Sequence, residues 1–167
     1  MKDLNIVLKI MSDEEFEKRA EESEEDSVIS QLATAFAASV DEKKLNTVLQ
    51  SISEILEKNE RSKRVFGLYD GDTYVGYVAL ADYESSTPEI QIELVEEYRQ
   101  RGIGYQALQS VIDLVFQRKD VTFLIYCARI DNLPSIALAK KCGGVLEKHD
   151  PLLDRIIHRY HIYRPNK

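Results

Sequence analysis

The segment from Glu89 to Gly104 combines residue types that can bind an anion. Its first part alternates polar and apolar residues as a strand does, a short charged loop follows, and the apolar spacing after the loop predicts a helix. The first N–H groups of a helix are unpaired and carry partial positive charge. Gly102 and Gly104 would let phosphate oxygens approach these groups. The segment predicts a phosphate site, although two glycines near a helix start are also typical of a simple turn.

Other phosphate-binding motifs do not fit this spacing. The chain contains no GxxxxGK[ST] loop, and the dinucleotide pattern GxGxxG fails because Ala107 stands where the third glycine is required. What remains is the pattern Arg-x-x-Gly-x-Gly at residues 99–104, followed by Leu108.

Hydrophobic periodicity places these residues on strands and helices. Strands are predicted at residues 5–10, 64–69, 73–80, 89–95, 121–127 and 155–163. Helices are predicted from residue 13, over residues 28–36, after residue 41, over residues 102–117 and from residue 132. Ser12 and Glu15 have the spacing of a capping box. Strands pair mainly antiparallel in the first half, whereas strand, helix, strand in the second half implies one right-handed parallel crossover.

Two motifs together resemble those of the GNAT acetyltransferase superfamily. The pattern at residues 99–104 resembles its pyrophosphate-binding signature. Asn132-x-x-Ser135, ahead of Lys-x-Gly at residues 141–143, resembles the branch that acetylates the N-termini of ribosomal proteins. The resemblance covers residues 89–163, roughly the C-terminal half. It implies an α/β (α+β) fold of the GNAT type, with a mixed sheet of six to seven strands, splayed central parallel strands and flanking helices.

The same resemblance implies that acetyl-CoA is the co-substrate. By position, the splayed strands that hold it would be residues 89–95 and 121–127. A bulge in the first of them frees backbone N–H groups for the pantetheine in the family, and this bulge maps onto Leu94 and Val95.

The resemblance also assigns the rest of the donor site. The pyrophosphate would lie on the amides from Arg101 through Ile103 to Gly104, with added charge from Arg99 or Arg101. Asn132 would face the pantetheine arm. A plain helix cap is an equally good interpretation of Asn132, and the two roles are compatible.

Direct attack of an amine on the thioester needs a base, an oxyanion donor and a protonated leaving thiol. Glu89 aligns with a glutamate that many family members place on this strand, so it is the candidate base, directly or through water, and Glu93 is the reserve. Strand alternation puts Glu89, Gln91 and Glu93 on one face. A strand glutamate is also typical of ordinary solvated surface, and both interpretations stay open.

The group that protonates the thiol departs from the common family pattern. The tyrosine that many relatives use falls on Ala139 in this sequence. In the branch with Asn-x-x-Ser the serine lies near the sulfur, so Ser135 is the candidate acid, while its place in the first helical turn is equally consistent with capping. Ala139 therefore keeps a second hypothesis open, a non-catalytic acyl-CoA-binding or regulatory domain.

Composition limits the function classes. A chain of 167 residues, 44% of them hydrophobic, predicts a single domain over residues 1–167. The net charge of −7 argues against a nucleic-acid binder. Apolar runs are too short for a membrane span and no secretory signal develops, so we expect a cytoplasmic protein. The histidines and cysteines lack metal-ligand spacing, which predicts no metal site, and Cys127 and Cys142 are expected to be buried thiols.

The leading hypothesis is an N-acetyltransferase acting on a primary amine, either a small molecule, a lysine or a peptide N-terminus. The acceptor site would form from the N-terminal helices and the last hairpin, where no motif identifies the substrate. The acidic residues from Asp13 to Asp26 are typical of a solvated helix face and, as the alternative, of a rim that attracts cations. A monomer or homodimer is expected.

Overall fold

The computed structural model of the chain describes residues 5–21, 62–148, 150, 151 and 153–166, together with residues 43, 46 and 50. Its strands are β1 (Ile6–Met11), β2 (Arg64–Asp70), β3 (Thr73–Ala81), β4 (Glu89–Leu94), β5 (Phe123–Arg129), β6 (Gly144–Glu147) and β7 (Ile157–Tyr163). They form one sheet in the order β1-β2-β3-β4-β5-β7-β6. The helices of the described ranges are α1 (Asp13–Glu21), α4 (Ile103–Val115) and α5 (Leu133–Lys141), with short 3-10 turns η1 (Glu96–Tyr98) and η2 (Leu153–Arg155).

This architecture confirms the predicted α/β fold with a mixed sheet. The helices predicted over residues 28–36 and after residue 41 lie outside the described residues, apart from Lys43, Asn46 and Gln50, which are helical. Within the part of the chain that the structure describes, no helix has the length and apolar character needed to cross a membrane.

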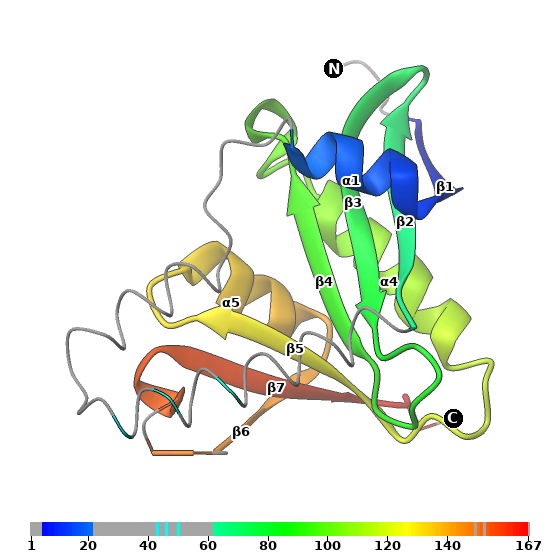
Figure 1. Cartoon of the computed structure of the whole chain (residues 1–167). Coiled ribbons are helices and arrows are strands. Elements are labelled where there is room, and N and C mark those ends of the chain that lie inside the picture. The colour runs from blue at the N-terminus through cyan, green and yellow to red at the C-terminus, as the bar shows by residue number, and fades with distance from the viewer. Residues whose placement is uncertain are drawn as a thin grey trace.

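The two central strands, β4 and β5, form the parallel pair, whereas every other neighbouring pair in the sheet is antiparallel. Their ladder has a single register pair, Glu89 with Ile125. A hydrogen bond from the Ile125 N–H to Pro88 O (2.9 Å) closes this junction. Beyond it the strands run apart, and in Figure 1 β4 and β5 leave their common end in different directions. The predicted splayed parallel strands are therefore confirmed.

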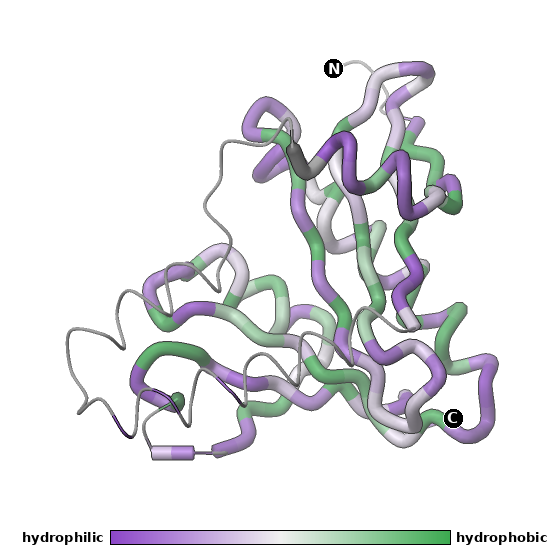
Figure 2. The backbone as a smooth tube through the Cα atoms, in the orientation of Figure 1, coloured by the Kyte–Doolittle hydropathy of each residue, from purple (hydrophilic) through white to green (hydrophobic). Residues whose placement is uncertain are grey.

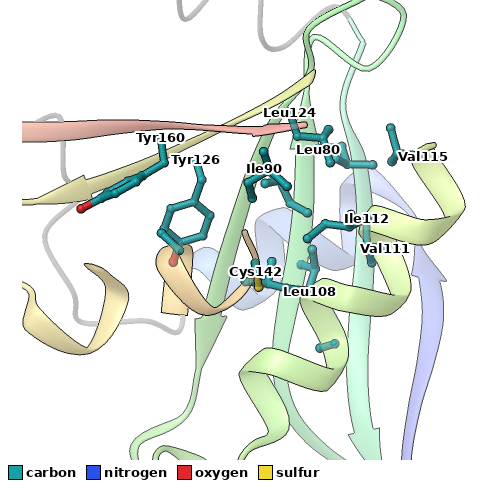
Figure 3. Packing of buried hydrophobic residues seen from close by; sticks show 14 of the residues in the cluster. Leu80, Ile90, Leu108, Val111, Ile112, Val115, Leu124, Tyr126, Cys142 and Tyr160 are labelled. Atoms are coloured by element: carbon teal, nitrogen blue, oxygen red, sulfur yellow. The ribbon is translucent and has the colours of Figure 1, made fainter. Parts of the chain in front are cut away.

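Helices cover both faces of the sheet. In Figure 1, α1 lies in front of the first strands and α4 lies behind them. Phe16 of α1 packs with Ala79 of β3, whereas Leu80, the next residue, belongs to the main core with α4, because successive strand residues point to opposite faces. α1 is largely hydrophilic in Figure 2, as expected for a helix with one packed stripe. Figure 3 shows the main core, in which Leu80, Ile90, Leu108, Ile112 and Leu124 are at most 1% exposed.

Local sequence signals explain where α1 and α5 begin. The Glu15 N–H donates to Ser12 Oγ (3.2 Å) and the Ser12 N–H donates to Glu15 Oε2 (3.0 Å), so the predicted capping box is confirmed. These bonds hold the pKa of Glu15 below its ordinary value. At α5, Asn132 Oδ1 accepts the Ser135 N–H (3.1 Å), and Pro134 occupies the first turn.

The β-bulge lies on a different strand from the one expected. The β3–β4 register is continuous from Glu89 to Leu94, so the prediction of a bulge in β4 is wrong. The irregularity is between β2 and β3, beside Gly76, whose φ is +146°. A Cβ at Gly76 would lie 2.1 Å from Glu93 O, so glycine is required for this close approach to β4.

Candidate active site

The N-terminus of α4 presents free backbone donors. Its cap residue, Gly102, adopts φ +79° and provides no side-chain bond to the helix. The first intrahelical bond runs from the Gln106 N–H to Gly102 O (3.2 Å), so the N–H groups of Ile103 and Gly104 have no partner within the helix. A Cβ at Gly102 would meet nothing within 4 Å, which leaves open space at this end of the helix. The arrangement suits a phosphate group.

The residues behind these donors fix the end of α4 against the sheet. Ile103 is 2% exposed, so its buried side chain anchors the first turn of α4. Gly104 is buried, and a Cβ there would lie 3.4 Å from Leu138 Cδ2 and 3.6 Å from Ile92 Cδ1 and from Leu94 Cδ1. These are ordinary contacts, so Gly104 marks where α4, α5 and β4 meet.

The two arginines of the loop lie on the surface beside this helix end. Arg99 is exposed, and its Nε donates to Leu94 O at the end of β4 (2.8 Å). The exposed Arg101 guanidinium lies 5.3 Å from the ring centroid of Tyr98. Lys141, in the last turn of α5, adds a third positive charge, with its Nζ 4.4 Å from the ring centroid of Tyr105 in the first turn of α4. The helix end is therefore flanked by cations on two elements.

Backbone donors on β4 differ between the two positions singled out in the sequence. The Val95 N–H donates to Val75 O (3.0 Å), so it is engaged with β3. In an antiparallel ladder the N–H groups alternate between the two sides of a strand. The Leu94 N–H therefore points to the β5 side, where the strands have diverged and the ladder offers no β5 partner. Of the expected pair, Leu94 alone faces the splayed strands.

Glu89 lies at the junction of the splayed strands. Its side chain is partly buried, and Gln91 Nε2 donates to Glu89 Oε1 (3.4 Å). Burial raises the pKa of Glu89, while the Gln91 hydrogen bond and the positive charge of Arg159 act in the opposite direction. A carboxylate with a raised pKa is a stronger base than a solvated one, which suits proton abstraction from an ammonium group.

The other carboxylate of this face has a different environment. The Tyr77 hydroxyl donates to Glu93 Oε2 (2.9 Å), and the Tyr77 ring packs edge-on against Phe16 of α1 with 5.0 Å between centroids. Glu93 is thus tied to the strand and helix beside it, whereas Glu89 stands at the strand junction. This geometry favours Glu89 over Glu93 as the base.

Cys127 departs from its expected burial. Cys142 is buried as predicted, but Cys127 is exposed, so that prediction is wrong for Cys127. It lies on β5 past the Glu89–Ile125 pair, where β4 has moved away and no longer covers the strand. Although the residue is exposed by surface area, the surrounding protein atoms partly desolvate its thiol. This desolvation and the charge of Glu89 raise the pKa of Cys127 to about 12, while the positive charge of Arg159 acts in the opposite direction.

Ser135 makes a contact that the sequence does not indicate. Its Oγ lies 2.8 Å from the hydroxyl of Tyr126, a β5 residue that is 3% exposed. The capping role belongs to Asn132, whose side chain binds the Ser135 N–H, so the Ser135 hydroxyl is not used as the cap. Ala139 is fully buried, and no hydroxyl is available at that position.

Glu89 and Ser135 lie on opposite faces of the sheet. Glu89 is paired with Ile125 and shares its face, while Tyr126, the next residue, points to the other face and binds Ser135 there. A group that meets both side chains must therefore lie between β4 and β5.

Sequence reasoning missed Tyr126, Arg159 and Lys141 as members of this region. Strand alternation could have placed Tyr126 on the face of α5, but no spacing signal identifies its bond to Ser135. A small pocket lined by Glu15, Lys18, Arg19 and Tyr69 lies beside α1 and involves none of the candidate residues.

Comparisons with known proteins agree with this geometry. The model of the acetyltransferase (GNAT) domain family matches residues 2–145. Spermidine N-acetyltransferase from Vibrio cholerae, in complex with CoA and spermine, superposes with a TM-score of 0.61 at 15% identity, over 95% of each chain. A ribosomal-protein-serine acetyltransferase-like protein from Vibrio cholerae gives 0.61 at 19% identity over 98% of this chain and 96% of that one. The Campylobacter jejuni N-acetyltransferase PseH gives 0.57 at 12% identity over 96% and 99%. No protein with curated annotation matches the sequence.

Proposed function

Since the chain belongs to the GNAT acetyltransferase family and is an N-acetyltransferase with acetyl-CoA as co-substrate, we propose that it acetylates a primary amine that approaches from the Glu89 face of the sheet. The observation that carries this proposal is the single pairing of β4 with β5 at Glu89 and Ile125, beside the uncapped end of α4. The free donors of α4 would hold the pyrophosphate, and the Leu94 N–H would bind the pantetheine arm between the strands.

Several features of the chain suit the binding of acetyl-CoA, the acetyl donor. Gly102 leaves space for phosphate oxygens, and Arg99, Arg101 and Lys141 would add favourable charge around them. Asn132, at the start of α5, would border the pantetheine arm in addition to its capping role.

We assign Glu89 as the base that takes a proton from the ammonium form of the acceptor, directly or through one water. The neutral amine then attacks the thioester carbonyl, a C–N bond forms, and the C–S bond breaks with its electron pair on sulfur. The second proton of the nitrogen would pass through water to the thiolate, which gives the amide and free CoA. Attack by the amine itself, without an acyl-enzyme, agrees with the raised pKa of Cys127, because a protonated thiol is a poor nucleophile.

The acceptor class is a primary amine of a small molecule, a lysine or a peptide N-terminus. Glu89, Glu93 and the acidic α1 lie on the face from which it would enter, and their charges would attract an ammonium group. The spermidine N-acetyltransferase acts on a polyamine, and a polyamine is one candidate of this class.

The test is thiol release from acetyl-CoA with a panel of polyamines, lysine peptides and peptides with free N-termini. We expect at least one amine to stimulate thiol release, with the acetylated product identified by mass spectrometry. Glu89→Gln should lower kcat in the acid and neutral range, whereas Glu84→Gln, the same change at an exposed glutamate in the loop between β3 and β4, should not. Equal rates for the wild type and Glu89→Gln at every pH would remove Glu89 from the role of base.

The alternative function, an acyl-CoA-binding or regulatory domain, is favoured by one observation, the fully buried Ala139 in place of the usual tyrosine. Acetyl-CoA binding in calorimetry, together with no acetyl transfer to any amine of the panel, would establish it.

We further propose that residues 1–167 act as one domain, as a monomer or homodimer in the cytoplasm. Size-exclusion chromatography with light scattering measures the assembly state.

A further inference from the structure

We propose that Tyr126 is a positioning residue for thiol departure, which holds the Ser135 hydroxyl so that it donates a hydrogen bond to the sulfur of CoA. This inference rests on the proposed acetyl transfer. It extends the proposal because Tyr126 belongs to neither of the motifs in the sequence.

The contact between the two hydroxyl groups is short and well placed. Tyr126 Oη and Ser135 Oγ are 2.8 Å apart, and either atom could donate. Burial raises the pKa of Tyr126, against the effect of the bond to Ser135, so the phenol keeps its proton at neutral pH. A phenol is a stronger acid than an aliphatic alcohol, which makes Tyr126 the donor and Ser135 Oγ the acceptor. The Ser135 O–H proton is then available for another partner.

Surrounding elements fix the direction of this second bond. The Tyr126 ring is 3% exposed and lies on the face of α5, next to Tyr160 across the β5–β7 ladder (Figure 3). Ser135 is held from its backbone side by Asn132. With its backbone and one side of Oγ engaged, Ser135 keeps its hydroxyl proton for the side of the splayed strands. Ser135 lies on the face of the sheet opposite Glu89. If the amine attacks the thioester from the Glu89 face, the leaving thiolate would lie toward Ser135.

The reaction balances with Tyr126 unchanged. Glu89 takes one proton from the ammonium group, the C–N bond forms, and the C–S bond breaks with its electron pair on sulfur. Ser135 donates a hydrogen bond to the thiolate as it leaves, and the second proton of the attacking nitrogen passes through water to the thiolate. Charge that develops on sulfur is thereby stabilised by a donor that is already oriented. The buried Ala139 makes such a donor necessary from another position.

The first experiment measures three variants, Tyr126→Phe, Ser135→Ala and the double variant that combines these two changes. Tyr160→Phe is the control. Tyr160 is also a buried β-strand tyrosine on the same face, 1% exposed, so its phenylalanine variant is a matched loss of one hydroxyl. We expect each single variant at Tyr126 or Ser135 to lose about tenfold in kcat, and the double variant to lose no more, because the two act as a unit. Acetyl-CoA affinity and the KM of the amine should change less than about twofold.

A second measurement does not depend on turnover. Wild-type protein should bind CoA more tightly than desulfo-CoA in calorimetry, and this preference should disappear in Ser135→Ala and decrease in Tyr126→Phe. Tyr160→Phe should keep both the preference and the wild-type kcat. Wild-type kcat in Tyr126→Phe, or losses that multiply in the double variant, would overturn the inference while leaving the acetyl transfer in place. A wild-type protein that acetylates no amine would instead overturn the proposed function.

Discussion

A single added charge at Gly102 tests the donor site most directly. The φ of +79° disfavours most side chains, but Asp and Asn tolerate this region, and the position has open space for either. Gly102→Asp and Gly102→Asn therefore have the same shape and similar backbone strain. They differ in one negative charge, placed beside the free N–H groups of Ile103 and Gly104.

The expected effect follows from Coulomb's law. At an effective dielectric constant of roughly 40 and a separation of about 6 Å, one carboxylate opposes each phosphate charge by about 1.4 kcal/mol. Two charges of a pyrophosphate give about 2.8 kcal/mol, which is about a hundredfold loss of acetyl-CoA affinity. Gly102→Asn should bind within a few-fold of the wild type.

Titration calorimetry with acetyl-CoA measures both variants. The difference between them should shrink as salt rises from about 0.1 M to about 1 M, because the Debye length falls from about 10 Å to about 3 Å. Gly71→Asp is the control for charge elsewhere, since Gly71 also has positive φ (+62°) and open space but lies in the β2–β3 turn. Equal affinity of Gly102→Asp and Gly102→Asn at low salt would refute the assignment of this helix end to the pyrophosphate.

Three further predictions concern the proposed base, Glu89, and the close contact between β3 and β4 at Gly76. The raised pKa of Glu89 means that the folded state binds a proton more tightly than the unfolded state, so stability is lost as pH rises through the folded pKa. Glu89→Gln should therefore melt higher than the wild type at pH 7, and the gap should close near pH 4. Arg159→Gln removes a charge that lowers the Glu89 pKa, so the acid limb of the pH–rate profile should move to higher pH. An unchanged acid limb would show that Arg159 does not influence the group that titrates in this limb. Gly76→Ala would place a Cβ 2.1 Å from Glu93 O and should destabilise by about 2–3 kcal/mol in urea unfolding, against about 1 kcal/mol for Gly71→Ala.

The sequence predicted several elements of the fold well because they depend on local backbone geometry. The capping box at Ser12, the α4 start after Gly102 and the parallel crossover between β4 and β5 follow from local spacing and chirality. Strand β6 was not assigned a range, since its four residues, Gly144–Glu147, are too few to show a period of two.

Other errors arose from tertiary context. Cys127 sits in an apolar run that is typical of a buried strand, yet the divergence of β4 leaves it exposed. The bulge was placed on β4 by analogy, whereas this chain uses Gly76 on β3 for its irregularity. Neither the divergence of β4 from β5 nor the irregularity of β3 can be read from the residues next to Cys127 or Leu94, because both depend on how the strands pair.

In the proposed mechanism the two faces of the sheet have different roles, and this difference explains why the sequence indicates the acetyl-CoA site but not the acceptor. Acetyl-CoA would bind to N–H groups at α4 and β4, and backbone groups of this kind can be recognised from glycine spacing. The acceptor would meet side chains on the other face, where Glu89, Glu93 and Tyr77 come from two strands and α1 packs beside them. Side chains that gather from separate elements need no fixed spacing along the chain. The motifs at residues 99–104 and 132–143 therefore suffice to indicate a GNAT acetyl-CoA site, whereas the amine acceptor must be found by screening candidate amines in the thiol-release assay.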